Sequence, residues 1–240
     1  MIYKLANSLN KIKPIPHKRW NSLDDALAAL DSKTRYLILR NFEELSNKKC
    51  YMDGHDDIDF LVEDIWEARR ALHVHNGINW NSPNHFSITI NDKNIKVGLR
   101  YLGDNYYDKK WERYMLDNRQ MNNSGFYIME EESYFYSLLY HSLLQKHELS
   151  NDYRERLYKM GLKLNIQLSD EVRYNKVLFN YLYEHDYKVP YPNDPSVVVN
   201  YKSVPNDLLN GKTIWTVKKA LWKIFHTTNK VYNKFYRGSV

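Results

Sequence analysis

The segment that most constrains the fold of this chain is residues 54–62, which read GHDDIDFLV. Alternate side chains of a strand share a face, so we expect Asp57 and Asp59 to point one way and Ile58 and Phe60 into a core. Two carboxylates this close repel each other and are costly to desolvate, and a cation offsets that cost. Mg²⁺ binds one or two carboxylates together with substrate phosphates. The segment therefore predicts a strand that carries a metal site, and a solvated turn entering a strand is the alternative.

The rest of the chain predicts an α+β fold around a mixed sheet. In the first half, apolar runs and capping residues indicate a helix from Asn21 or Ser22 to Leu30, strands at 36–40 and 58–62, a helix at 63–75, and a hairpin of 85–90 with 93–102. From Glu130 onward the spacing of apolar residues becomes helical, with helices expected around 134–145, 153–164 and 172–185.

This change of pattern divides the chain into an α+β core over 1–128 and a mostly helical region over 129–240. The second region contains a proline-rich loop at 189–210 and a final helix at 214–237. That helix is amphipathic and basic, with no acidic residue after Gly211, which suits either the surface of an anionic membrane or packing on the domain.

The composition limits the classes of binding partner but does not identify a single class. The 240 residues carry a net charge of +6 and 15% aromatic side chains, which favours nucleotides, phosphates, nucleic acid or an anionic membrane as partners. Cys50 is the single cysteine, so neither a disulfide framework nor a Cys-rich zinc site is expected. The N-terminus lacks the apolar stretch of a secretory signal and no window of the sequence suits a membrane span, which together predict a cytoplasmic protein.

Several catalytic motifs are absent from the sequence. It contains no Walker A loop, no G-x-G-x-x-G and no G-x-S-x-G elbow, which excludes the common P-loop, dinucleotide-binding and serine-hydrolase classes.

Four segments of the sequence resemble a known group of proteins. Residues 36–45, 54–62 and 97–108, and residues 135–141 with Lys146 close behind, are similar to bacterial nucleotidyltransferase-like proteins of polysaccharide gene clusters. These belong to the polymerase-β-like nucleotidyltransferase superfamily, and the resemblance spans roughly residues 34–160. It implies a small mixed-sheet core followed by a helical region. It also implies that Asp57 and Asp59 are the catalytic pair that binds Mg²⁺ or Mn²⁺.

The sequence departs from the superfamily pattern at two places. A Gly-Gly or Gly-Ser turn normally precedes the aspartates, and Arg40-Asn41 stands near that place. The third carboxylate normally lies on a later strand in a pattern such as V-D-I-R, and here Gly98 takes its position in V-G-L-R. Asp104 could substitute for it, although its position suits a turn.

Five further residues are candidates for substrate binding. Arg40, Arg100 and Lys146 would neutralise phosphate charge, and His55 and His141 would touch substrate. Three of them have a plainer alternative. Arg100 would be a surface arginine of a strand and His55 the end of a loop. His141 would either face the cleft as a polar pair with Gln145, four residues on, or be a satisfied core histidine.

The leading hypothesis is a Mg²⁺-dependent nucleotidyl- or phospho-alcohol transferase of glycan or polysaccharide biosynthesis. Its donor would be a nucleotide or nucleotide-linked compound and its acceptor a glycan or phosphate. The alternative is a catalytically impaired protein of the same fold that binds a membrane surface or a protein partner. Nucleic acid is a less favoured partner, because no RRM, KH or zinc-finger signature is present.

Overall fold

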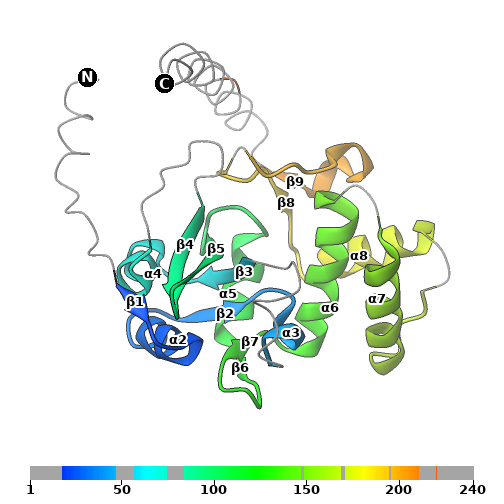
Figure 1. The fold of residues 1–240 in the computed structure, drawn as a ribbon. Coiled ribbons are helices and arrows are strands. Elements are labelled where there is room, and N and C mark those ends of the chain that lie inside the picture. The colour runs from blue at the N-terminus through cyan, green and yellow to red at the C-terminus, as the bar shows by residue number, and fades with distance from the viewer. Residues whose placement is uncertain are drawn as a thin grey trace, which may run out of the picture.

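The computed structural model describes residues 18–46, 57–74, 84–146, 149–168, 171–194 and 196–210, together with residue 220. Its centre is a twisted mixed sheet with helices on both faces (Figure 1). The predicted α+β class, a mixed sheet followed by a mostly helical region, is confirmed.

Within the described residues the main sheet has seven strands in the order β1-β4-β5-β3-β2-β7-β6. The central pair, β3 and β5, is parallel, whereas β4 with β5 and β2 with β3 are antiparallel. The strands are β1 (Arg19–Trp20), β2 (Tyr36–Ile38), β3 (Asp57–Val62), β4 (His85–Ile90), β5 (Lys93–Tyr101), β6 (Gln120–Met121) and β7 (Tyr127–Ile128).

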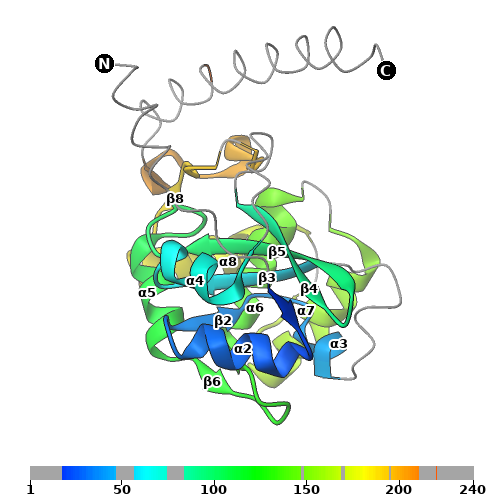
Figure 2. The same ribbon diagram turned by 60° about the vertical axis from the view of Figure 1, so that its left-hand side comes forward.

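The helices lie in two groups. Helices α2 and α4 pack together over one side of the sheet, as Figure 2 shows, and α6, α7 and α8 lie on the other. The helical elements are α2 (Leu23–Asp31), α3 (Phe42–Ser46), α4 (Ile65–Leu72), α5 (Lys109–Asp117), α6 (Glu131–Tyr140), the π-helical turn η1 (His141–Gln145), α7 (Asn151–Lys163) and α8 (Glu171–Glu184).

The proline-rich segment after α8 has little regular structure, and its two ends pair with each other as short strands. Strand β8 (Val189–Pro190) pairs in parallel with β9 (Leu209–Asn210), and two 3₁₀ turns, η2 (Tyr201–Ser203) and η3 (Asn206–Leu208), lie between them.

Local sequence signals explain several element boundaries. The predicted hairpin is β4 and β5, and Asn91 and Asp92 between them have φ of 48° and 62°, the left-handed values that a tight hairpin turn requires. The predicted helix cap is also present, because Ser22 Oγ accepts a 3.1 Å hydrogen bond from the Asp25 amide.

Two predicted boundaries were wrong. The helix expected over 63–75 is α4, which begins at Ile65 because the Asp64 carboxylate caps it and ends at Leu72 because His73 turns left-handed. The strand expected to reach Arg40 ends at Ile38, and Asn41 turns the chain into α3 with a φ of 56°. Asparagine tolerates this conformation better than other residues with a side chain, glycine apart.

The hydrophobic core draws on residues from Trp20 to Leu208. Trp111 of α5 joins its two halves: its ring stacks on Tyr187, which follows α8, at 5.6 Å and meets Tyr140 of α6 at 6.0 Å. The predicted regions 1–128 and 129–240 thus contribute to one core, and the boundary between them stays a prediction.

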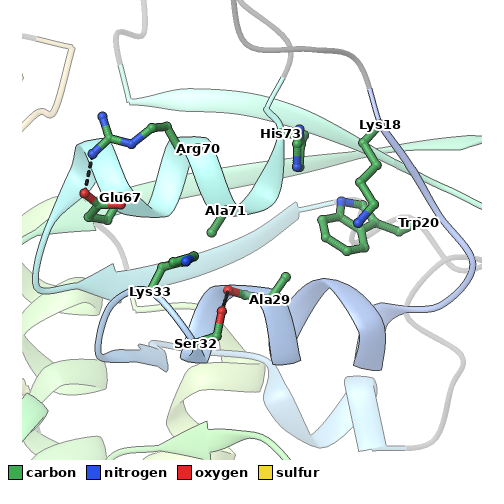
Figure 3. A pocket seen from close by; sticks show the side chains of 9 residues that line it. All are labelled: Lys18, Trp20, Ala29, Ser32, Lys33, Glu67, Arg70, Ala71 and His73. Atoms are coloured by element: carbon green, nitrogen blue, oxygen red, sulfur yellow. Dashed lines mark hydrogen bonds and ion pairs between the residues drawn. The ribbon is translucent and has the colours of Figure 1, made fainter.

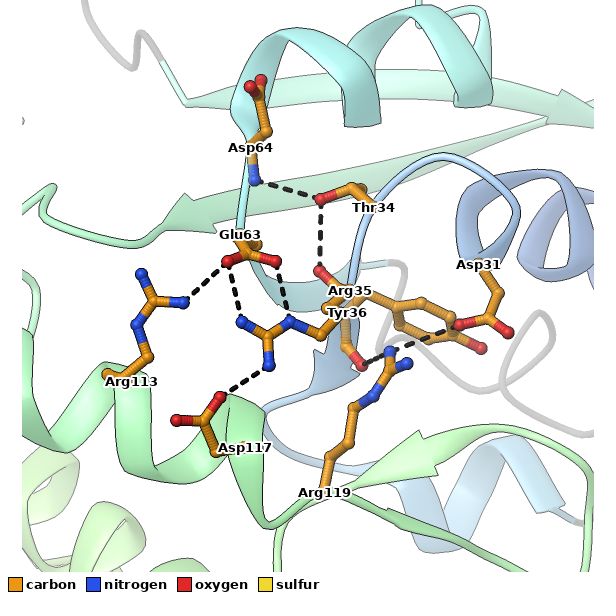
Figure 4. A network of polar contacts seen from close by, with 9 residues as sticks. All are labelled: Asp31, Thr34, Arg35, Tyr36, Glu63, Asp64, Arg113, Asp117 and Arg119. Atoms are coloured by element: carbon orange, nitrogen blue, oxygen red, sulfur yellow. Dashed lines mark hydrogen bonds and ion pairs between the residues drawn. The ribbon is translucent and has the colours of Figure 1, made fainter.

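A network of ion pairs joins the start of β2 to the end of β3 (Figure 4). Glu63 receives two hydrogen bonds of 2.7 Å from Arg35 and an ion pair of 2.6 Å from Arg113 of α5. Arg35 also reaches Asp117 at 2.6 Å. These contacts engage Glu63, which is the residue at which the sequence predicts that α4 begins.

Several predictions fall outside the described residues. They include His55 and, apart from residue 220, the helix at 214–237. No helix in the described part of the chain is long and apolar enough to cross a membrane.

Candidate functional site

The floor of the site is one face of the central strands. Along β3 the side chains alternate as predicted: Ile58 and Phe60 are buried, while Asp57 is exposed and Asp59 partly buried on the opposite face. Both carboxylates therefore leave the sheet on the same side.

The register of β5 and β4 extends this floor sideways. Asp59 lies directly opposite Gly98 of β5, and Gly98 lies opposite His85 of β4. Arg100, two residues after Gly98, shares its face. The sheet therefore places an aspartate, a glycine and a histidine in one row, with an arginine beside them.

Above this floor is a cavity of about 600 Å³. It combines acidic and basic side chains: three aspartates, three arginines, one lysine and two histidines. Its wall comes from helix α7, the turn η1 and the proline-rich segment. The lining residues are Arg40, Asn41, Asp57, Asp59, His85, Arg100, Tyr106, His141, Gln145, Lys146, Ser150, Asp152, Tyr153, Arg156, Ser196, Val197 and Val198.

Arg40 lines the cavity and forms an ion pair with Asp59. Its Nη2 lies 2.5 Å from Asp59 Oδ2, and its Nη1 donates to Tyr106 Oη at 3.1 Å. Burial works to raise the pKa of Asp59, but the charge and hydrogen bond of Arg40 outweigh it and hold that pKa below its usual value. Asp59 is therefore ionised at neutral pH.

His141 lies behind this pair, at the start of the π-helical turn. Burial and then the charge of Arg40 lower its pKa to about 3, so the imidazole is neutral. Arg40 Nη1 lies 3.2 Å from His141 Nδ1, and because an arginine can only donate, Nδ1 accepts and the ring proton is on Nε2.

Gln145 completes the surroundings of that ring. Its side-chain Oε1 is placed 2.8 Å from His141 Nδ1, while its Nε2 has no hydrogen-bond partner in the described structure. Two acceptors cannot share a hydrogen bond, so with Nδ1 as acceptor this contact requires the amide orientation that places Nε2 toward Nδ1. The predicted His141–Gln145 pair is therefore a contact of this site.

Arg100 is fixed by acidic partners. Its Nη1 lies 3.0 Å from Asp194 Oδ2 and 3.9 Å from Asp104 Oδ2, and its guanidinium lies 4.4 Å from the Tyr106 ring centre. Asp194 also accepts hydrogen bonds from the amide and hydroxyl of Ser196, which lines the cavity. Arg100 thus connects the sheet to the proline-rich wall.

Asp104 does not replace the carboxylate that Gly98 lacks. It sits in the turn after β5, where Oδ1 accepts from the Tyr106 amide at 2.8 Å. It is 1% exposed and is absent from the cavity lining, and burial raises its pKa to about 6. The expectation that Asp104 suits a turn is confirmed.

The cavity brings together the predicted residues that the structure describes. Asp57, Asp59, Arg40, Arg100, His141 and Lys146 all line it. Their roles in binding and catalysis stay predictions, as does the role of His55.

Sequence reasoning missed other residues of the lining. His85 could have been found from the register of the predicted hairpin, because it faces Gly98 across one strand pair. Tyr153 and Arg156 of α7 and Val197 and Val198 of the proline-rich segment carry no sequence signal, since only tertiary packing brings them to the sheet.

The carboxylate pair fits one divalent ion. Mg²⁺ takes one or two carboxylates when substrate phosphates and water supply its remaining ligands, and Asp57 and Asp59 provide that pair. A third carboxylate at position 98 would not fit as the site stands, because a Cβ there would lie 2.2 Å from Asp59 Oδ1. No group of three or more potential metal ligands occurs among the described residues.

A second, smaller hollow of about 390 Å³ lies away from this face, between α2 and α4 (Figure 3). Lys18, Lys33, Arg70 and His73 line it, with Trp20 beneath Lys18. Its one carboxylate, Glu67, is paired with Arg70, so the hollow offers no carboxylate pair for a metal ion.

Comparison with known proteins gives one distant likeness. Neither a protein-family model nor a curated protein matches the sequence. Among solved structures, the chain is similar to the antibiotic-resistance factor ANT(2'')-Ia, described in solution as having substrate-regulated conformation dynamics, with a TM-score of 0.38 and 12% identity. The match covers 68% of this chain and 90% of that one.

Proposed function

We propose that the cavity binds a nucleotide or nucleotide-linked donor through its phosphates. The protein then transfers one of two groups to a hydroxyl or phosphate acceptor, by breaking a phosphoanhydride bond of the donor. Transfer of the nucleotidyl group of a nucleoside triphosphate releases pyrophosphate, and transfer of the phospho-alcohol group of a nucleotide-linked donor releases a nucleoside monophosphate. Asp57 and Asp59 would hold Mg²⁺ or Mn²⁺. The observation that carries this proposal is that one cavity contains this carboxylate pair together with Arg40, Arg100 and Lys146.

Two cationic side chains of the cavity differ in how they would bind a phosphate. Arg100, held in place by Asp194, offers a fixed planar fork for a phosphate, whereas Lys146 offers a point charge on a flexible stem. Asp57 and Asp59 would hold a divalent ion, whose charge would offset the negative charge that gathers during transfer. Glycan or polysaccharide synthesis, as the setting of this reaction, rests on the resemblance of the four sequence segments.

A second candidate function is ligand binding without catalysis. The observation in its favour is Gly98, because it leaves the cavity floor without a third acid and its lack of a side chain is what makes room for the Asp59 carboxylate. Such a protein would use the cavity to bind a nucleotide and the segment 214–237 to contact a membrane or partner. Lys218→Glu with Lys219→Glu in the full chain should then abolish co-sedimentation with anionic vesicles.

The test of the proposal is calorimetric titration with nucleoside triphosphates and nucleotide sugars, with and without excess Mg²⁺. Wild-type protein should bind at least one of them more tightly with Mg²⁺. Asp57→Asn with Asp59→Asn should weaken that binding by at least about tenfold, as the loss of groups that hold a metal does. Asp152→Asn, a cavity aspartate that is largely exposed on α7, is the matched control and should retain binding.

Equal binding with and without Mg²⁺, or equal effects of the double variant and the control, would contradict the proposed metal site. Release of pyrophosphate from a bound nucleoside triphosphate would establish nucleotidyl transfer. Tight binding without any product would favour the binding protein instead.

A further inference from the structure

Arg40 and Asp59, which both line the cavity, form an ion pair. Their side chains are 10% and 19% exposed, so solvent screens the pair only weakly. The same guanidinium is fixed on its other nitrogen by Tyr106 Oη at 3.1 Å and lies 3.2 Å from His141 Nδ1. Arg40 is therefore held by three cavity groups at once, and Asp59 is the anionic one.

One of the two Asp59 oxygens is engaged by an ion pair in this arrangement. Oδ2 is the acceptor of the Arg40 ion pair, and Oδ1 leans over Gly98, into space that a Cβ would fill. Asp57 differs, because it is exposed and has no ion pair within the described part of the chain. Of the two carboxylates proposed to share a metal ion, Asp59 is thus ion-paired with Arg40, whereas Asp57 is not ion-paired within the described part of the chain.

We propose that Arg40 is the resident counter-ion of Asp59 and that a divalent cation must displace it to bind. This rests on the proposed function in taking Asp57 and Asp59 as the metal-binding pair. The displaced guanidinium stays in the cavity, where a ligand phosphate becomes its new anionic partner. Arg40 thus opposes binding of the metal alone and favours binding of the metal together with a phosphate.

The other arginine of the floor cannot play this part. Arg100 is paired with Asp194 and approaches Asp104, and neither carboxylate belongs to the proposed metal pair. Arg156 at the rim bonds to Asn41 Oδ1 at 3.1 Å and to Glu43 at 3.1 Å. Of the three arginines that line the cavity, Arg40 is therefore the one paired with a proposed metal ligand.

The test is calorimetric titration of the full chain with Mn²⁺ alone, in the absence of nucleotide. Arg40→Gln removes the competing charge and should bind Mn²⁺ at least about tenfold more tightly than wild type. An opposite charge within about 4–6 Å changes the proton affinity of a carboxylate by about one to three pKa units, and a metal ion competes for the same oxygens. Arg156→Gln, which removes an equal charge from the same cavity, should change the affinity by less than about threefold.

Circular dichroism and thermal unfolding check that each variant is folded, and Arg40→Met, which keeps an apolar stem, replaces Arg40→Gln if that variant is not. Tighter Mn²⁺ binding that appears only in the Arg40 variant supports the proposal, including the case in which wild type shows no measurable binding. Equal or weaker binding by the Arg40 variant, or equal gains in both variants, overturns it. Because no nucleotide is present, failure of the nucleotide titrations leaves this result unaffected.

Discussion

Replacing Gly98 with alanine tests whether the floor of the cavity is packed as described. The added Cβ would lie 2.2 Å from Asp59 Oδ1 and 3.4 Å from its Cγ, and real Cβ atoms essentially never approach closer than 3.0 Å. The Asp59 carboxylate must therefore retreat by at least about 0.8 Å. It cannot do so freely, because Oδ2 is held 2.5 Å from Arg40.

This steric conflict should lower the stability of the Gly98→Ala variant. Overpacking a well-filled site by one methyl group costs about 1–3 kcal/mol, and disturbing a buried ion pair acts in the same direction. A loss of about 2 kcal/mol in the free energy of unfolding lowers the Tm of a domain of this size by about 4–8 °C. The same displacement should weaken Mg²⁺-dependent nucleotide binding, because Asp59 is one of the two proposed ligands.

Differential scanning calorimetry measures the change in Tm, and Lys96→Ala is the matched control. Lys96 is exposed on the same strand and the same face, one row before Gly98, so its truncation should change stability by no more than about 0.5 kcal/mol. If Gly98→Ala unfolds at the same temperature as Lys96→Ala, the close approach of Asp59 to Gly98 does not exist and the reasoning about position 98 is refuted.

Two further predictions concern titratable groups. Hydrogen bonds from Arg35 lower the pKa of Glu63 to about 2, so its contribution is present above pH 4.5 and is lost as the pH falls toward 2. After screening at this partly exposed site, Glu63→Gln should cost about 1 kcal/mol at neutral pH and nothing near pH 2 in urea unfolding. Burial and the charge of Arg40 lower the pKa of His141 to about 3, so wild type should lose stability as the pH falls below 6.5, by about 2 kcal/mol near pH 5. His141→Gln should flatten that part of the pH profile, and an unchanged profile would show that His141 is not buried as a neutral ring.

The elements nearest the aspartates could be predicted because local rules agree there. The strand at 57–62 combines period-two alternation with a buried apolar face, and the hairpin that follows has turn residues suited to left-handed φ. Where two neighbouring residues could each begin a helix, the sequence did not show which of them does so. Glu63 reads as the first residue of a helix, but it is bound by Arg35 and Arg113, and Asp64 takes the capping position instead.

The candidate site could be predicted only in part, for a geometrical reason. Asp57 and Asp59 follow from the alternation of a single strand, whereas the ion pair of Arg40 with Asp59 depends on how β2 and β3 are placed. The link from Arg100 to Asp194 joins residues 94 positions apart, and no local pattern indicates it. The sequence therefore indicated the acids of the cavity but not their partners.

The proline-rich segment determines when the cavity can exist during synthesis. Asn193 bonds to the Asp104 carbonyl at 2.8 Å, and Val198, only a few residues later, forms part of the cavity wall. The described strands of the main sheet are complete by residue 128, so a growing chain can pair them long before the wall emerges from the ribosome. At about 5–20 residues per second, the interval between the two events lasts several seconds. During that time the nascent protein has its aspartates without the opposing wall, so the cavity is complete only when almost the whole described chain has been made.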